Sequence, residues 1–374
     1  MNKVYLDNAA TSALRPEVIQ EMTRVLTQEY GNPSSTHSLG RTAKNTLELA
    51  RKSIAKNLNA TAQEIIFTSG GTEGNNWILR AGVRDLKVTR IITSKIEHHA
   101  VLHAVWALQN EFNIAVDYVQ LQADGSIDLT HLVELLSVEN KTLVSLMHVN
   151  NEIGSVLDLH RVGQICKEHS ALFHTDAVQS VGKVRFDLSE LSVDFLVASA
   201  HKFHGPKGVG FIFVRKNSGL QPLFFGGEQE KGLRAGTEAL HQIAGMSSAL
   251  GLSYEHLIKE EQYIKSLKVY LLESLQKSFP DYKVNGPSNG FYTVVNILLP
   301  FPEDKTAMIL FHLDMKGIAV SRGSACQSGS IKPSHVLAEI LTGDDLKKPS
   351  LRVSFSHFNT QEDIDLFMQA LLMI

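Results

Sequence analysis

The stretch S-A-H-K-F-H-G-P-K-G, residues Ser199–Gly208, joins two short apolar runs and is the most informative part of the chain about its fold. The run before it, Asp194–Ala198, and the run after it, Val209–Val214, are typical of buried strands. A loop of this composition between two strands places polar groups at the rim of a sheet. Lys202 lies in it between a histidine and a phenylalanine, where a desolvated amine can act as a nucleophile. A solvated turn lysine is the alternative that this stretch alone leaves open.

The composition is that of an ordinary globular protein with room for two domains in 374 residues. The net charge of -3 and the lack of a long basic run give no indication of direct nucleic-acid or membrane binding. The first residues carry neither a signal-peptide core nor a transit pattern, and no run is apolar enough for a membrane span. Two cysteines, Cys166 and Cys326, favour a reducing compartment. We expect a soluble, cytoplasmic protein.

Upstream of the lysine loop, short apolar strands alternate with amphipathic helices. The expected strands are Glu64–Thr68, Arg90–Thr93, Ala115–Val119, Thr142–His148 and Ala171–Thr175. The expected helices are Arg15–Glu29, Gly40–Leu58, Trp77–Arg84, His98–Asn110, Leu129–Leu136 and Val162–His169. This alternation predicts an α/β fold with a mainly parallel sheet covered on both faces.

Downstream of the loop the pattern changes near Ser253. A charged amphipathic stretch, Tyr254–Phe279, predicts one long connecting helix. After it we expect short strands and helices, namely strands at Val294–Leu299, Ile318–Ser321 and Leu351–Ser354 and helices at Lys305–Asp314, Ser334–Leu341 and Gln361–Met373. We therefore predict a large domain over residues 12–253 and a small α+β domain formed by residues 1–11 and 254–374.

A glycine-rich turn, S-G-G-T-E-G-N-N at Ser69–Asn76, separates a strand from a helix. Free backbone N–H groups and the positive end of the helix dipole meet at such a junction, which makes it a candidate anion site. Thr72 adds a hydroxyl. The turn matches neither the dinucleotide fingerprint nor the ATP-binding P-loop. A tight helix entry without a ligand is the alternative.

Polar residues follow the predicted strands, where parallel sheets place their active residues. They are Thr72, His98, Asn151, Asp176 and Lys202. Asp176 could be a helix cap. Beside Lys202 and the glycine turn, however, it could pair with a protonated heterocyclic nitrogen. A lysine, such a carboxylate and a phosphate cradle together favour pyridoxal phosphate.

The sequence resembles fold-type I pyridoxal-phosphate enzymes of the class V aminotransferase-like group, and within it NifS/IscS-type cysteine desulfurases. The resemblance extends from Tyr5 to about Met373. Its motifs occur in order along the chain: Y-L-D-N-A-A-T (5–11), G-N-P-S-S-T-H (31–37), F-T-S-G-G-T-E-G-N-N (67–76), E-H-H-A-V (97–101), M-H-V-N-N-E-I-G (147–154), H-T-D-A-V-Q-S-V-G-K (174–183), the lysine loop, R-A-G-T-E (234–238), R-G-S-A-C-Q-S-G-S (322–330) and L-R-V-S-F (351–355). It implies a large domain with a seven-stranded sheet.

The resemblance implies a role for each candidate residue. Lys202 would bind the cofactor covalently and move the substrate Cα proton, while Asp176 would keep the pyridine nitrogen protonated. His98 would stack on the ring and serve in acid–base steps. Gln179 would contact the phenolic oxygen, and Asn151 would lie beside the ring and the substrate. Arg352 would bind the substrate α-carboxylate. The phosphate would be held by Gly71, Thr72, Ser199, His201 and, from the neighbouring subunit of a homodimer, Thr237.

Cys326 determines the predicted reaction. It lies among small polar residues, where a cysteine is exposed and reactive, whereas Cys166 fits the apolar pattern of its helix and is expected to be buried. The resemblance implies that Cys326 takes the sulfur of L-cysteine as a persulfide and that alanine is released. The persulfide would pass to an acceptor protein, either an iron–sulfur scaffold or a tRNA thiouridylase.

Three other functions remain open on the sequence. A selenocysteine lyase or a class V aminotransferase would share the cofactor site, but transamination needs no thiol. A sulfur-delivery scaffold without turnover would not need the full set of catalytic residues. Two departures from the family pattern concern the acceptor and the loop: the chain ends at Ile374, short of the extension in IscS-type relatives, and Gln327 follows the cysteine where relatives often carry threonine.

Overall fold

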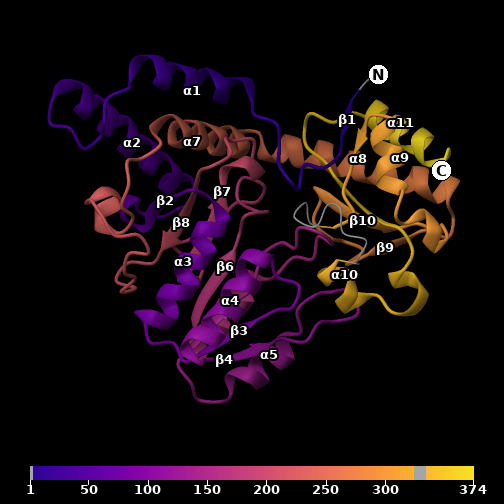
Figure 1. Cartoon of the computed structure of the whole chain (residues 1–374), viewed down its shortest axis with the longest axis horizontal. Coiled ribbons are helices and arrows are strands. Elements are labelled where there is room, and N and C mark those ends of the chain that lie inside the picture. Colours follow the sequence, from indigo (N-terminus) through magenta and orange to yellow (C-terminus); the bar gives the residue numbers. More distant parts are fainter. Residues whose placement is uncertain (1–2, 324–333) are drawn as a thin grey trace.

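The computed structural model describes residues 3–323 and 334–374, and its centre is a seven-stranded sheet (Figure 1). The strand order is β2-β8-β7-β6-β5-β3-β4, and β8 alone runs antiparallel to its neighbours. The bounds are β2 (Ile65–Thr68), β3 (Arg90–Thr93), β4 (Ala115–Tyr118), β5 (Thr142–Ser145), β6 (Leu172–Asp176), β7 (Phe195–Ser199) and β8 (Gly210–Val214). The predicted mainly parallel sheet is confirmed.

Helices cover both faces of this sheet because alternate strand residues point to opposite sides. Phe67 of β2 packs in one core and its neighbour Ile66 in another. The core of Phe67 includes residues of α1 (Pro16–Gln28), α2 (Ser38–Asn57), α5 (Leu129–Leu136), α6 (Leu159–Glu168) and α7 (Leu240–Glu255). The core of Ile66 lies under α3 (Gly71–Arg84) and α4 (His99–Phe112). The carboxyl ends of the parallel strands stay open for polar side chains.

A smaller lobe has its own core beneath an antiparallel sheet of order β12-β10-β9. Its strands are β9 (Lys283–Asn285), β10 (Val294–Leu298) and β12 (Ser350–Ser354), and its helices are α8 (Leu257–Ser278), α9 (Ile309–Met315), α10 (His335–Ile340) and α11 (Gln361–Leu371). The N-terminus joins this lobe, because β1 (Val4–Tyr5) pairs with β11 (Ile318–Ala319). Figure 1 shows both termini there. The domain limits given above stay a prediction.

The largest differences from the predicted helices concern α7 and α3. The expected single helix over residues 254–279 is the end of α7 followed by α8, with His256 between them. The sequence pattern misses most of α7 because that helix is buried on several sides and lacks a polar stripe. The second difference is α3, which begins at Gly71 and not at Trp77. Tertiary packing therefore overrides the low helix propensity of its glycines.

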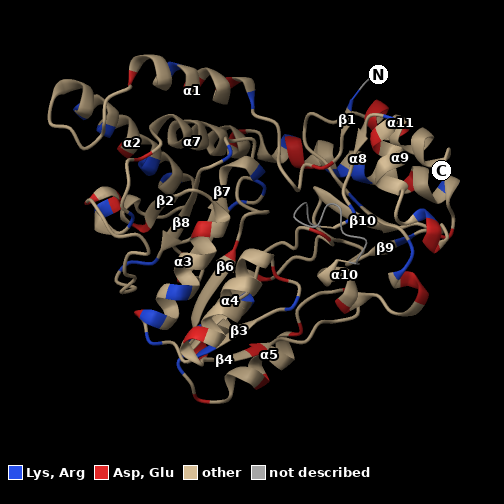
Figure 2. Cartoon of the chain, viewed as in Figure 1, with Lys and Arg blue, Asp and Glu red and all other residues tan. Residues whose placement is uncertain are grey.

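Along the ribbon in Figure 2, Lys and Arg residues (blue) and Asp and Glu residues (red) occur in both lobes. This distribution agrees with the small net charge of the chain. In the described ranges, no helix has the length and apolar character needed to cross a membrane.

Candidate active site

A cavity of about 240 Å³ lies where the carboxyl ends of β2, β6 and β7 face the smaller lobe. Ten of the predicted site residues line it: Gly71, Thr72, His98, Asn151, Asp176, Gln179, Ser199, His201, Lys202 and Arg352. A larger hollow of about 850 Å³ between α1, α2 and α7 contains none of these groups. The smaller cavity is therefore the candidate active site.

The glycine turn before α3 forms one wall of the cavity. Gly70 has a φ of +145°, a conformation that favours glycine, and the helix begins at the next residue. A Cβ on Gly71 would lie 2.8 Å from Cγ2 of Val178, so only glycine lets the backbone pack this closely. The first free N–H groups of α3, together with the hydroxyls of Thr72 and Ser199, provide donors for an anion.

His201 lies beside this turn as a neutral donor or acceptor. Its Nδ1 is 3.1 Å from Oγ1 of Thr11. Burial, and secondarily the charge of Lys202, lowers the pKa of His201 to about 4. The imidazole therefore contributes hydrogen bonds to the cavity at neutral pH and no positive charge.

Asp176 ends β6 as a buried carboxylate with fixed geometry. Its Oδ2 accepts a hydrogen bond of 2.7 Å from Nδ2 of Asn75, and its Oδ1 accepts one of 3.0 Å from the backbone of Val178. The sequence reading did not single out Asn75. Because Asn75 lies one helical turn after Gly71, its position within the glycine motif was the signal that could have found it.

His98 is the N-cap of α4 and also lines the cavity. Its Nδ1 accepts a hydrogen bond of 3.1 Å from the N–H of Ala100, so the ring proton is placed on Nε2. Burial lowers the pKa of His98, while the charge of Asp176 opposes that shift. The neutral ring is a flat surface suited to stacking.

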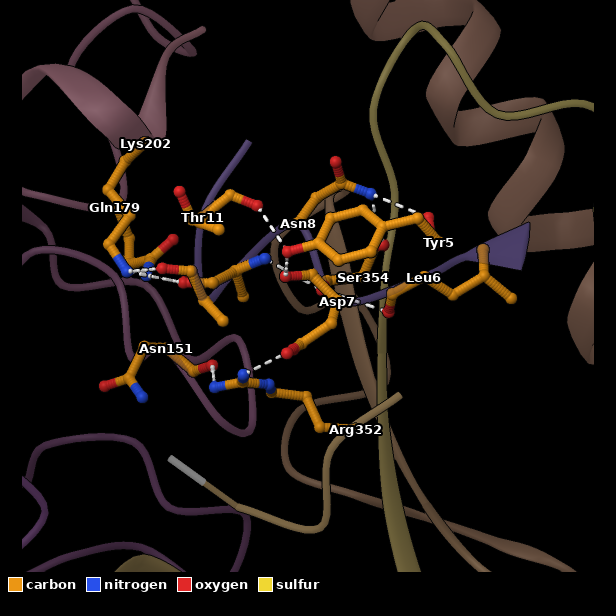
Figure 3. A network of polar contacts seen from close by, with 12 residues as sticks. Tyr5, Leu6, Asp7, Asn8, Thr11, Asn151, Gln179, Lys202, Arg352 and Ser354 are labelled. Carbon is orange, nitrogen blue, oxygen red and sulfur yellow. Dashed lines mark hydrogen bonds and ion pairs between the residues drawn. The ribbon is translucent and has the colours of Figure 1, made fainter. Parts of the chain in front are cut away.

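Lys202 follows β7 in a short 3₁₀ turn and reaches across to the N-terminal segment (Figure 3). Its Nζ donates hydrogen bonds of 2.7 Å to the carbonyl oxygens of Ala9 and Ala10. Nε2 of Gln179 donates to the same Ala9 oxygen at 2.9 Å. The lysine predicted to be the nucleophile thus lies within the cavity and not on the solvated surface.

Arg352 enters from β12 of the smaller lobe and is 1% exposed. Its Nη2 donates to Oδ1 of Asp7 at 2.7 Å, and its Nη1 donates to the carbonyl oxygen of Asn151 at 3.1 Å. Its Nε is buried and has no acceptor among the described residues. A buried guanidinium with a spare donor can bind a carboxylate.

Two predicted residues are not placed in the cavity. Thr237 is exposed and does not line the cavity of its own chain. Cys326, with its neighbour Gln327, lies outside the described residues. Cys166 is buried as expected, and burial raises the pKa of its thiol to about 12.

A family model described as Aminotransferase class-V matches residues 4–367. The chain belongs to the class-V aminotransferase family. It is 41% identical to a cysteine desulfurase IscS of Dictyoglomus turgidum, over 99% of this chain and 93% of the relative. It is 40% identical to a cysteine desulfurase IscS of Clostridium botulinum (strain Kyoto / Type A2), over 99% and 94%. These relatives place this family member among the cysteine desulfurases.

Solved structures agree with this family assignment. A NifS-like protein superposes with a TM-score of 0.91 at 33% identity, covering 100% of this chain and 99% of its own. SspA in complex with cysteine superposes with a TM-score of 0.82 at 31% identity, covering 96% and 100%. The predicted fold class and enzyme class are confirmed.

Enzymes of this family depend on pyridoxal 5′-phosphate, and the residues of the cavity fit that group. The cavity contains an amine for covalent attachment, a buried carboxylate for the ring nitrogen, and a glycine turn that a Cβ would fill. The cavity thus offers a flat imidazole to a planar ring, hydrogen-bond donors to a phosphate and a carboxylate to a protonated nitrogen.

Proposed function

We propose that this cysteine desulfurase binds pyridoxal 5′-phosphate in the cavity and converts L-cysteine to L-alanine, leaving a persulfide on Cys326. The observation that supports it most is the convergence of Lys202, Asp176 and Arg352 on one cavity. An amine nucleophile, a buried carboxylate and a carboxylate-binding guanidinium are the groups that cofactor-dependent chemistry on an amino acid requires.

The proposal gives each candidate residue of the cavity a stated role. When bound, the cofactor supplies an electron sink for the bond that breaks at Cα. Lys202 provides the amine that holds the cofactor and moves the Cα proton, and the charge of Asp176 favours protonation of the ring nitrogen. His98 would support the ring face, and the Gln179 side chain would contact the phenolic oxygen. The phosphate is held by Gly71, Thr72, Ser199, His201 and Thr237 of the second subunit.

The substrate is held by its carboxylate and loses its sulfur to the chain. Arg352 binds the α-carboxylate, and Asn151 lies beside it. The Cys326 thiolate attacks the substrate sulfur, so that an S–S bond forms and the Cβ–S bond breaks. The electron pair of the broken bond remains with Cβ, which takes up a proton to become the methyl group of alanine.

The sulfur acceptor is an iron–sulfur scaffold or a tRNA thiouridylase in the cytoplasm. Similarity to the IscS-type relatives supports the former. Transfer of labelled sulfur from the persulfidated enzyme to each purified acceptor distinguishes the two.

Two substitutions test the reaction. Cys326→Ala should keep the cofactor absorbance but lose persulfide formation from L-cysteine, because the attacking thiol is gone. Lys202→Ala should lose the absorbance of the lysine-bound cofactor. Cys166→Ala is the matched control, since that thiol is buried away from the cavity. Sustained sulfur transfer by Cys326→Ala would overturn the proposal.

Substrate comparison separates the alternatives. Turnover is compared on L-cysteine, L-selenocysteine and an amino-donor/keto-acid pair, with alanine release as the readout. We expect sulfur release from L-cysteine and no transamination. Preferential use of selenocysteine would indicate a lyase, and no turnover on any substrate would indicate a scaffold.

A further inference from the structure

The buried Arg352 guanidinium has an ionic partner from the far end of the chain. Asp7 lies 345 positions earlier in the sequence, yet its Oδ1 accepts a hydrogen bond of 2.7 Å from Nη2 of Arg352 (Figure 3). Asp7 is the only carboxylate paired with Arg352 among the described residues. It does not line the cavity itself, whereas Arg352 does. Asp7 therefore touches the candidate substrate site only through the arginine.

The backbone around Asp7 is fixed on both sides. Asp7 forms a parallel bridge with Ser354 of β12, the strand that also carries Arg352. The next residue, Asn8, donates its side-chain N–H to the Ser354 carbonyl at 2.9 Å, and the N–H of Ala9 donates to Oγ of Ser354 at 2.8 Å. Before it, the Tyr5 hydroxyl donates to the carbonyl of Asp7 at 3.1 Å. The carboxylate is thus held at one place relative to β12.

The two bonds of Arg352 use different nitrogens and fix the plane of the guanidinium. Nη1 is bound to Asn151 and Nη2 to Asp7, while Nε has no acceptor in the described part of the chain. An arginine has five N–H donors in a rigid fork, so two fixed nitrogens determine where the remaining donors point. A side chain this long would otherwise sample several rotamers and lose entropy on binding a ligand.

We propose that Asp7 is the positioning residue for the α-carboxylate site, holding Arg352 so that its remaining donors are presented to the substrate. The inference rests on the proposed function, since it assumes that Arg352 binds the amino-acid carboxylate. It assigns part of substrate affinity to the N-terminal segment, which makes no direct contact with the substrate through Asp7.

The test measures ligand binding to the cofactor-loaded enzyme by calorimetry. L-Alanine is the probe with an α-carboxylate, and cysteamine is the probe that lacks one. Asp7→Ala should weaken L-alanine binding about tenfold, because the Arg352 side chain loses the partner that holds it and must then be ordered when the ligand binds. Its affinity for cysteamine should stay within about twofold of the parent protein. The KM for L-cysteine should rise while kcat changes little.

Two further variants keep the test sharp. Asp7→Asn retains an acceptor oxygen and should fold even if Asp7→Ala does not. If Asp7→Asn loses less L-alanine affinity than Asp7→Ala, the hydrogen bond positions Arg352. If the two variants lose equal affinity, the charge of Asp7 positions it. Glu260→Gln is the control, because it breaks the Arg15–Glu260 ion pair of 2.7 Å, which lies outside the cavity.

The results distinguish a failure of the inference about Asp7 from a failure of the proposed function. Unchanged L-alanine affinity in both Asp7 variants would overturn the inference, as would a parallel loss of cysteamine affinity, which would indicate a merely structural pair. If the parent enzyme releases no sulfur from L-cysteine, the proposed function itself fails.

Discussion

Histidines around the sheet are held neutral by burial. His174 of β6 is fully buried, with its Nδ1 2.9 Å from Oγ of Ser145, and desolvation lowers its pKa to about 3. His148 and His204 show the same effect, with pKa values of about 4 and 3. Protonating such a ring would place a charge in an apolar core, so these residues link the stability of the fold to pH.

His174→Gln tests this link. Below pH 6.5, His174 is protonated in the unfolded chain but stays neutral in the folded protein. The free energy of unfolding of the parent protein therefore falls by about 1.4 kcal/mol per pH unit from this residue as the pH falls toward 3. The variant lacks that loss. Urea unfolding at pH 7.5, 6 and 5 should show the parent more stable at pH 7.5 and the difference shrinking by about 2 kcal/mol at pH 5. A difference independent of pH would contradict this.

At the scale of elements, the start of β8 is packed directly against the glycine turn. A Cβ on Gly210 would lie 2.4 Å from the carbonyl oxygen of Ala198 and 2.8 Å from Cα of Gly70. Strand β8 therefore supports the turn from behind, while the turn faces the cavity. The antiparallel direction of β8 places its first residue, and not its last, at this edge of the sheet.

Gly210→Ala should therefore weaken both the fold and the cofactor site. The clash is with backbone atoms, which cannot rotate away, and overpacking of this kind costs roughly 1–3 kcal/mol. Gly251→Ala in α7 is the matched control, because a Cβ there meets nothing within 4 Å and should stabilise the helix by about 0.5–1 kcal/mol. Thermal melts and cofactor titration of both variants provide the measurement. Equal melting temperatures would refute the role given to Gly210.

In the whole molecule, a buried ion pair attaches the long irregular segment between β8 and α7 to the large sheet and its helices. Glu230 in this segment binds Nη1 and Nη2 of Arg51 in α2 at 2.6 and 2.7 Å, and it also accepts the N–H of Phe67 in β2 at 2.8 Å. The same segment carries Arg234, which pairs with Glu73 in the first turn of α3. Through Glu230, the segment that bears Thr237 is therefore joined to both α2 and β2.

Glu230→Ala should destabilise the protein by about 3–5 kcal/mol, because it leaves the buried Arg51 charge with only the partly exposed Glu48 as an ionic partner. Combining it with Arg51→Met should recover much of the loss, as a double-mutant cycle in urea would show. The exposed pair Arg80–Glu111 is the control, and Glu111→Ala should have a far smaller effect because water screens that pair. Simple additivity in the cycle would contradict coupling between Arg51 and Glu230.

Local sequence patterns, together with the family resemblance, predicted most of the strands and helices, although not β9 or most of α7, and most of the residues that line the cavity. Periodicity and strand-end position are local properties, so Thr72, Asp176 and Lys202 could be assigned from their immediate neighbours. Most of the buried helix α7 was not predicted, because its sequence has no polar face. The role of Cys326 stays a prediction from the composition of its loop and from the family resemblance.

Contacts between residues that are far apart in the chain depend on how the elements pack, which local sequence patterns do not specify. Asp7 and Arg352 lie near opposite ends of the chain, and their contact depends on β1 and β12 entering the same lobe. Glu230 likewise reaches Arg51, 179 positions away in the sequence, through the packing of separate elements. The periodicity of apolar residues along an element shows which of its faces is buried. It does not show which residues of other elements that face will contact, because this depends on how the elements pack together.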